Sequence, residues 1–253
     1  LTLALLLGES RPLPPPEELN LLFGKPETVS LLRKNVALVR AHDRLAAHGS
    51  APEPLRSAAE SERARVGRTV GVLGGLGALL AASGIPYVFP KAFQHYPDMG
   101  HDIDLLVAGE PGRAEELVSS GFRSEPGPDT LVQRIAGKRS LLLSESGIPL
   151  EIHHRRVGPL GEHALLGARL VGNRRALAIE GKEFFVPRPE DQFLLQVVQR
   201  VYGHMLIRIS DAASSLKLLG GEFDWDSALR GARDAGILPG LRCYASFLAQ
   251  IHP

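Results

Sequence analysis

Hydrophobic and polar positions divide the chain into a helical first part, a middle part with short strands, and a helical last part. In the first part, apolar side chains recur at helical spacing over residues 28–48, between two proline-rich breakers. A long helix is predicted over 53–82, because Ser83-Gly84 supplies a natural C-terminal stop. In the last part the pattern predicts helices over 190–201, 207–219, 225–235 and 238–251.

The middle part predicts β-structure. A short strand is expected at 85–91 and a second at 102–107, followed by a short helix over 111–120. A β-hairpin is indicated further along, with arms at 139–144 and 148–154 around the turn Glu145-Ser146-Gly147.

Two acids open the second of these strands. Because residues i and i+2 share a face of a strand, Asp102 and Asp104 are expected to point the same way, about 6–7 Å apart. Two carboxylates that close repel by roughly 2–3 kcal/mol at an effective dielectric constant near 20. A divalent cation with oxygen ligands would relieve this repulsion. The alternative is a wet strand end at which both acids are solvated and no metal binds.

The second hairpin arm brings a third acid. On that arm Leu150 and Ile152 share one face, whereas Glu151 and His153 share the other. We therefore expect Glu151 to arrive on a strand near the acid pair.

Composition narrows the function classes. The net charge of +1 argues against a protein that grips long nucleic acid through a basic surface. The single cysteine, Cys243, cannot form an intrachain disulfide and fits a reducing compartment. The apolar stretches at 1–7 and 70–82 are both too short to span a bilayer. These features predict a cytoplasmic protein with no membrane partner.

The order of these motifs resembles the DNA polymerase β-type nucleotidyltransferase superfamily and, within it, a poorly characterised bacterial nucleotidyltransferase family. The resemblance covers about residues 62–250, and its most specific part is the Asp-Ile-Asp-Leu-Leu-Val strand at 102–107. Supporting motifs are Gly84-Ile85-Pro86, Leu150-Glu151-Ile152-His153, Asp211 with Leu218-Leu219, and Asp224-Trp225. The resemblance implies an α+β fold in which a small mixed β-sheet core at 61–187 lies between an N-terminal helical arm at 1–60 and a C-terminal helical subdomain at 188–253.

The resemblance also implies a reaction. Such enzymes move a nucleoside monophosphate from a nucleoside triphosphate (NTP), ATP being one candidate, to a hydroxyl group on a small molecule, a peptide or protein, or a tRNA end. Asp102, Asp104 and Glu151 would be the catalytic residues and would bind two Mg²⁺ ions, with Mn²⁺ as the other metal to consider. Glu151 would hold the ion that activates the acceptor and could act as general base. The few aromatic residues and even charge balance favour a small-molecule or peptide acceptor over long nucleic acid.

Further residues are expected around the triphosphate. The residues assigned to nucleotide binding are Lys91, Ala92 and His101, and those assigned to support are His95, His153 and Arg155. Two positions depart from the family pattern. Ala92 stands where the superfamily has a glycine that lets the backbone approach the phosphates. Asp98 stands where the related family tends to have an arginine.

These departures leave two alternatives beside the enzyme hypothesis. One is a degenerate member, a binding or scaffold protein that kept the fold and lost turnover. The other is a glycosyltransferase, which also uses an Asp-x-Asp motif to hold a metal on a nucleotide sugar. The helical N-terminal arm does not supply the α/β unit that such an enzyme would need.

Overall fold

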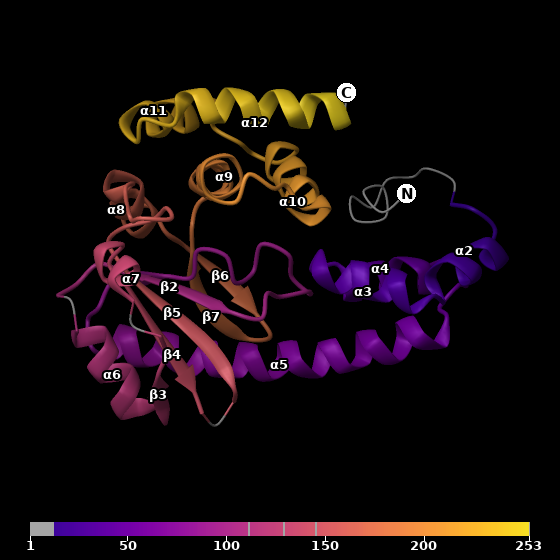
Figure 1. The fold of residues 1–253 in the computed structure, drawn as a ribbon, viewed down its shortest axis with the longest axis horizontal. Coiled ribbons are helices and arrows are strands. Elements are labelled where there is room, and N and C mark those ends of the chain that lie inside the picture. Colours follow the sequence, from indigo (N-terminus) through magenta and orange to yellow (C-terminus); the bar gives the residue numbers. More distant parts are fainter. Residues whose placement is uncertain (1–12, 111, 129, 145, 253) are drawn as a thin grey trace. The chain divides into compact units, whose positions relative to one another are not determined.

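The computed structural model describes residues 13–110, 112–128, 130–144 and 146–252, and confirms the predicted α+β class (Figure 1). The first predicted apolar stretch, 1–7, lies outside the described residues. The chain divides into two compact units, each of which is discontinuous in sequence. Unit 1 comprises Leu1–Arg68, Phe93–Gly100 and Ile207–Lys217, and unit 2 comprises Thr69–Ala92, His101–Leu206 and Leu218–Pro253. The division at 60/61 and 187/188 stays a prediction.

Unit 1 is helical. Its elements are α2 (Pro16–Phe23), α3 (Pro26–Lys34), α4 (Leu38–Ala47), the first part of α5 (Glu53–Ala82) and most of α10 (Ile209–Leu219). Leu19, Phe23, Leu38 and Leu45 are buried in its core.

The apolar spacing over 28–48 extends across two helices, α3 and α4. Helix α3 ends at Lys34 and helix α4 begins at Leu38, and Val36 between them has a φ of 52°. A residue in the left-handed region cannot continue a right-handed helix, so the apolar spacing runs across two helices rather than one.

The long helix α5 covers the predicted 53–82, and its second part belongs to unit 2. Gly84, two residues after its end, has a φ of 67°. Glycine adopts this conformation without steric cost, which is why the predicted stop is effective.

The five-stranded sheet of unit 2 has the order β1-β2-β5-β4-β3. Its strands are β1 (Tyr87–Val88), β2 (Ile103–Val107), β3 (Ser124–Pro126), β4 (Lys138–Leu143) and β5 (Ile148–His154). The β2–β5 pair is parallel and the other pairs are antiparallel, so the sheet is mixed. All five residues of β2 are buried, as expected for a central strand. Strand β1 is shorter than predicted, since Pro86 and Pro90 flank it and cannot donate to a ladder.

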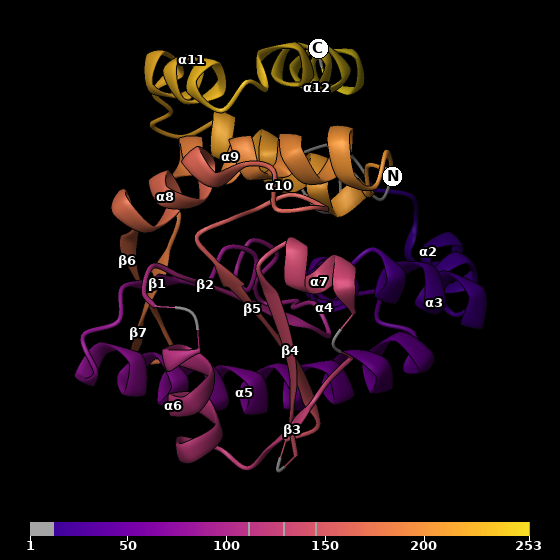
Figure 2. The ribbon, with the colours of Figure 1, turned by 60° about the vertical axis from the view of Figure 1, so that its left-hand side comes forward.

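The remaining elements of unit 2 are helices and a second hairpin. These elements are α6 (Arg113–Gly121), α7 (Leu131–Ile135), α8 (Ala164–Gly172), β6 (Arg175–Ile179), β7 (Lys182–Val186), α9 (Pro189–Val197), η1 (Val198–Gly203), α11 (Trp225–Asp234) and α12 (Leu238–Ile251). In unit 2, α8 and α9 lie on one side of the sheet, and α6 and the second part of α5 on the other (Figure 2).

The elements of unit 2 that were not predicted are β3, α7, α8, the β6–β7 hairpin and the π-helix η1. The β6–β7 hairpin turns at Glu180-Gly181, where both residues have positive φ angles of 51° and 73°. The helix predicted over 190–201 changes at Val198 into the π-helix η1, which lies next to the site described below.

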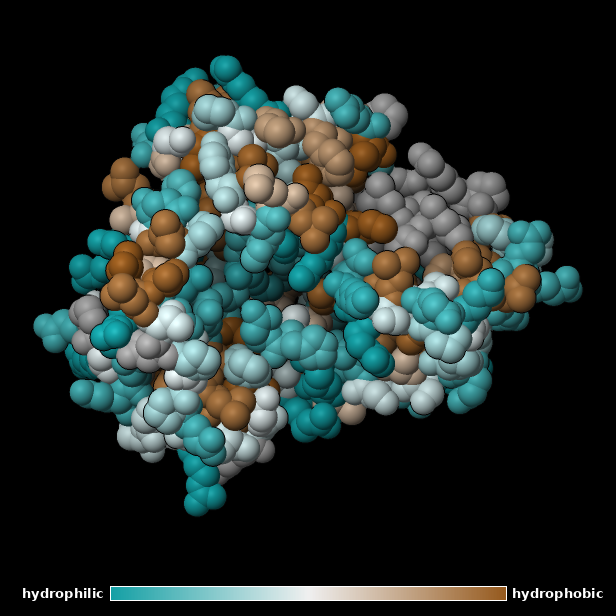
Figure 3. All heavy atoms as spheres, in the orientation of Figure 1, coloured by the Kyte–Doolittle hydropathy of each residue, from teal (hydrophilic) through white to brown (hydrophobic). Residues whose placement is uncertain are grey.

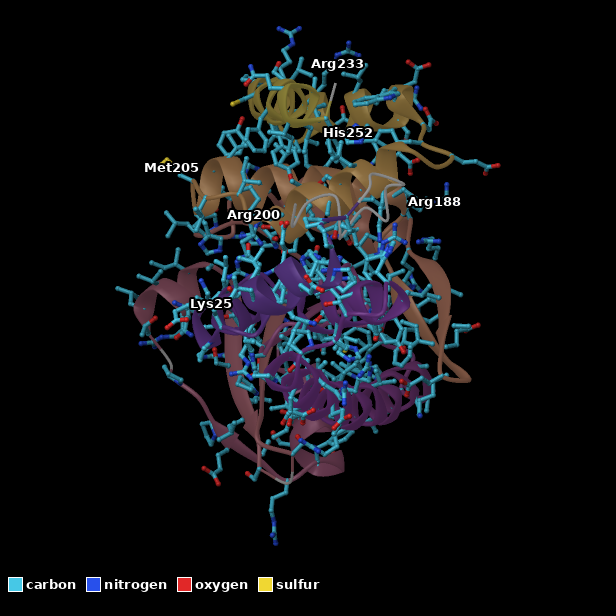
Figure 4. The ribbon with its side chains drawn as sticks, turned by 90° about the vertical axis from the view of Figure 1, so that its right-hand side faces the viewer. Lys25, Arg188, Arg200, Met205, Arg233 and His252 are labelled. Carbon is cyan, nitrogen blue, oxygen red and sulfur yellow. The ribbon has the colours of Figure 1, made fainter. Side chains whose placement is uncertain are left out.

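On the face drawn in Figure 3, hydrophobic side chains occur in small groups among hydrophilic ones. Among the described residues, no helix combines the length and apolar character needed to cross a membrane.

Candidate functional site

The site lies on one face of the central strands of unit 2. In the parallel pair β2–β5, Asp104 is the register partner of Glu151, and Leu106 is the partner of His153. In the antiparallel pair β4–β5, Lys138 is the partner of His153. Register partners project from the same face of a sheet, so Asp104, Glu151, His153 and Lys138 point the same way. The third acid therefore lies beside the second, as the sequence predicted.

The His153 imidazole joins the two carboxylates. Its Nε2 atom lies 2.8 Å from Oδ1 of Asp104 and 3.0 Å from Oε2 of Glu151. Two ammonium groups complete the cluster: Nζ of Lys91 lies 2.6 Å from Oδ2 of Asp104, and Nζ of Lys138 lies 3.5 Å from Oε2 of Glu151. Asp104 is only 4% exposed, so its charge depends on these partners rather than on water.

The partners determine the protonation states. Burial by itself would raise the pKa of Asp104, but the charge of Lys91 and the hydrogen bond from His153 outweigh burial and hold that pKa well below its usual range. The hydrogen bond from His153 is also the main reason that the pKa of Glu151 is lowered. Burial would lower the pKa of His153, yet the hydrogen bonds to Asp104 and Glu151 raise it above its ordinary value. The cluster is thus two carboxylates bridged by the His153 imidazole.

The same three side chains suit a divalent cation. Asp104, Glu151 and His153 each offer one ligand atom, and these atoms lie within 4.8 Å of one another. Carboxylates suit Mg²⁺ and Mn²⁺, whereas imidazole favours transition metals. A cation here would replace the proton on Nε2 of His153, because a histidine ligand must be neutral. The donor set therefore fits one divalent cation.

The structure separates Asp102 from this cluster. Asp102 is exposed, one residue before β2, and is not among the three clustered ligands. It lines a different cavity, which it shares with Glu151. Among the described residues, the third possible ligand beside Asp104 and Glu151 is thus His153, whereas the sequence suggested Asp102. The metal-binding role of Asp102 stays a prediction.

The other predicted residues are distributed as follows. Lys91 contacts Asp104, and Ala92 directly after it is buried. His101 and Arg155 are exposed at the two ends of the central strands, and Arg155 has a φ of 59°. His95 belongs to unit 1, where its Nδ1 atom lies 2.8 Å from Oγ of Ser214.

Asp98, the second departure from the family pattern, has a structural role in unit 1. Its carboxylate accepts hydrogen bonds from the backbone N–H groups of Val39 and Arg40 at 2.7 and 3.2 Å, and from Nε of Arg40 at 3.0 Å. These are first-turn N–H groups of α4, which have no partner inside the helix. An arginine could not accept these bonds, so the departure stabilises the helical arm and is not by itself a sign of lost activity.

A cavity of about 230 Å³ adjoins the cluster; we call it the lysine cavity. Its polar lining residues are Lys91, Asp104, Lys138, His153, Gln199 and His204. Gln199 comes from η1 and His204 directly follows it, whereas Leu106, Leu195 and Val198 supply apolar surface. Among the described residues, Nδ1 of His153 is a buried polar atom without a hydrogen-bond partner.

Three of these residues, Lys138, Gln199 and His204, were not predicted from the sequence. Lys138 could have been found, because counting back along the hairpin from its turn places it opposite His153. Gln199 and His204 had no signal, because a helix pattern does not show where a π-helical turn will bring its residues.

A sequence model described as an uncharacterised nucleotidyltransferase family matches residues 26–252, which is most of the chain. The chain belongs to this nucleotidyltransferase family. A search of curated proteins gives no significant match. Family membership supports a nucleotide substrate and a transferase, in agreement with the carboxylate cluster. The wider resemblance to the polymerase β-type superfamily stays an interpretation of the motifs.

Proposed function

We propose that this protein transfers a nucleoside monophosphate from an NTP to a hydroxyl group, with Asp104 and Glu151 at the reaction centre. The observation that carries the proposal is the cluster of Asp104, Glu151 and His153 on adjacent central strands in a member of a nucleotidyltransferase family.

The lysine cavity is the proposed donor site. Lys91 and Lys138 place two positive charges where a triphosphate brings several negative ones. The unpartnered Nδ1 of His153 offers a polar contact to the same group. The apolar surface of Leu195 and Val198 suits a base or ribose, and Gln199 can form hydrogen bonds with the edge of the base.

The transfer balances as follows. The acceptor oxygen attacks the α-phosphorus, a new P–O bond forms, the bond between that phosphorus and the bridging oxygen breaks, and pyrophosphate leaves. The Glu151 carboxylate accepts the proton of the acceptor hydroxyl. Lys91 and Lys138 compensate the charge that develops on pyrophosphate.

A divalent cation held by Asp104, Glu151 and His153 would supply charge compensation at the α-phosphate. We retain two Mg²⁺ ions, or Mn²⁺ in their place, as part of the proposal, with Asp102 as the additional ligand. The cytoplasm is the proposed location, since a protein with Cys243 exposed as a free thiol suits a reducing compartment.

Isothermal titration with a non-hydrolysable NTP tests binding. We expect nucleotide binding only when Mg²⁺ or Mn²⁺ is present. Incubation with α-labelled NTPs and a pool of small metabolites then tests transfer. Reproducible label transfer would also exclude the scaffold alternative.

A pair of matched variants tests whether Asp104 belongs to the reaction centre. Asp104→Asn should abolish metal-dependent binding and transfer, whereas Asp234→Asn, a change at an exposed position of α11, should leave both intact. Thermal unfolding of both variants shows whether the fold is kept. Metal-independent binding in the native protein, or unchanged transfer in a folded Asp104→Asn protein, would refute the proposal.

A further inference from the structure

A second cavity, of about 320 Å³, lies on the other side of the reaction centre; we call it the acidic cavity. Three rows of register partners lie on the same face of the sheet, two residues apart along β4 and β5; the first row extends to β3 and the other two extend to β2. The rows are Glu125, Leu142 and Pro149; Ser140, Glu151 and Asp104; and Lys138, His153 and Leu106.

The two cavities lie at opposite ends of these three rows. The first row lines the acidic cavity, and the third row lines the lysine cavity. The middle row is shared, because Glu151 and Ser140 line the acidic cavity whereas Asp104 lines the lysine cavity. The carboxylate pair thus stands between two hollows on one continuous face.

In-line displacement requires this kind of arrangement. The attacking oxygen and the leaving pyrophosphate must lie on opposite sides of the α-phosphorus. If the triphosphate occupies the lysine cavity, the acceptor must come from the side of Glu151, where the acidic cavity opens.

The charges of the two cavities differ. The acidic cavity is lined by Asp102, Glu125 and Glu151, and no lysine or arginine is among its described lining residues. The lysine cavity has two lysines and two histidines against the single carboxylate of Asp104. An anionic acceptor would be repelled from the acidic side, whereas an ammonium group would be attracted.

The remaining lining fits a compact organic molecule. Leu142 and Pro149 supply apolar surface, and Ser140 supplies a hydroxyl. The cavity volume falls at the lower end of the range for small-molecule sites. This volume and charge suit a sugar-sized or smaller compound better than a nucleic acid end.

We infer that the acidic cavity is the acceptor site and that the acceptor is a small hydroxyl compound carrying an ammonium group. The inference rests on the proposed function and assigns its second substrate. The acceptor hydroxyl lies toward Glu151, and the ammonium group toward Glu125. Glu125 is exposed on the edge strand β3, where its Oε1 atom accepts a hydrogen bond of 3.2 Å from Oγ of Ser144. Glu125 is therefore a specificity-determining residue of the site.

Backbone amide NMR spectra of the full chain test the inference with two sugars that differ at one position. Glucosamine carries an ammonium group where glucose has a hydroxyl. With Mg²⁺ and a non-hydrolysable NTP present, glucosamine should shift the amide signals of Gly127 and Ser140 in the acidic cavity. Its dissociation constant should be at least about fivefold lower than that of glucose. The NTP itself should shift Gly158 and Gly203, which line the lysine cavity.

A charge-removing variant gives the decisive comparison. Glu125→Gln should remove the preference for glucosamine and leave NTP binding unchanged, whereas Glu183→Gln, at an exposed position of β7, should keep the preference. Equal or absent shifts with the two sugars, or a preference that survives in Glu125→Gln, would overturn the acceptor assignment. Failure of the NTP to bind with metal would count against the proposed function itself, so the two failures are distinguishable.

Discussion

Lys91 has two partners in the proposed cycle, and their demands oppose each other. In the structure its Nζ lies 2.6 Å from Oδ2 of Asp104, one of the oxygens that a cation would use. With nucleotide bound, the same ammonium group is proposed to contact the triphosphate. Lys91→Met should therefore change metal affinity and nucleotide affinity in opposite directions.

The size of both affinity changes can be derived from the contact between Lys91 and Asp104. A hydrogen bond between charged groups contributes roughly 1.5–3 kcal/mol, and the Lys91 side chain is 32% exposed, so screening by solvent reduces this value. We assign about 1.4 kcal/mol to the Lys91 contact, which corresponds to a tenfold change in a dissociation constant. Lys91→Met should bind Mn²⁺ or Mg²⁺ alone about tenfold more tightly, because the competing cation is gone. It should bind NTP with metal about tenfold more weakly, because a phosphate contact is lost.

Titration of each ligand into the variant and the native protein measures both effects. Lys182→Met, at an exposed position of β7, is the matched control and should change neither affinity. Weaker binding of both ligands in Lys91→Met would indicate general damage to the site, and two unchanged affinities would show that Lys91 is a solvated lysine. Either result would refute the reasoning.

Three further predictions concern the metal, the acid pair and the fold. Removing divalent cations with a chelator should abolish transfer from α-labelled NTP, and added Mg²⁺ or Mn²⁺ should restore it; activity that persists in excess chelator would contradict the metal assignment. Glu151→Gln should lower transfer at least about hundredfold, as loss of a general base does, with NTP affinity weakened much less; an unchanged rate, measured as label transfer, would exclude Glu151 as base. Gly167→Ala should lower the free energy of unfolding, measured by denaturant titration, by roughly 2 kcal/mol or more, because the added Cβ would collide with the backbone carbonyl of Arg155. Gly172→Ala in the same helix is the control. Its Cβ would meet open space, so the free energy of unfolding should change by less than about 1 kcal/mol. Equal effects of the two glycine substitutions would mean that the contact between α8 and the end of β5 is not tight.

Local patterns predicted the elements that carry the chemistry. The alternation around Glu151 placed it and His153 on one face, and the apolar run after Asp104 identified a buried strand. The stop at Gly84 followed from the conformational freedom of glycine. In contrast, the break at Val36 had no signal, because nothing in helical spacing shows that one residue will turn left-handed.

The sequence by itself thus determined the α+β class, the two central strands β2 and β5 and the acids they carry, since side-chain alternation and turn chemistry are local properties. Only the tertiary structure decided which side chains meet. The parallel register of β2 with β5 put His153 rather than Asp102 between Asp104 and Glu151, and the contact of Lys91 with Asp104 compensates the buried charge. The π-helix η1 brought Gln199 to the lysine cavity. Contacts of this kind join residues that are not neighbours in the sequence, and their geometry depends on packing and burial that no short stretch of sequence contains.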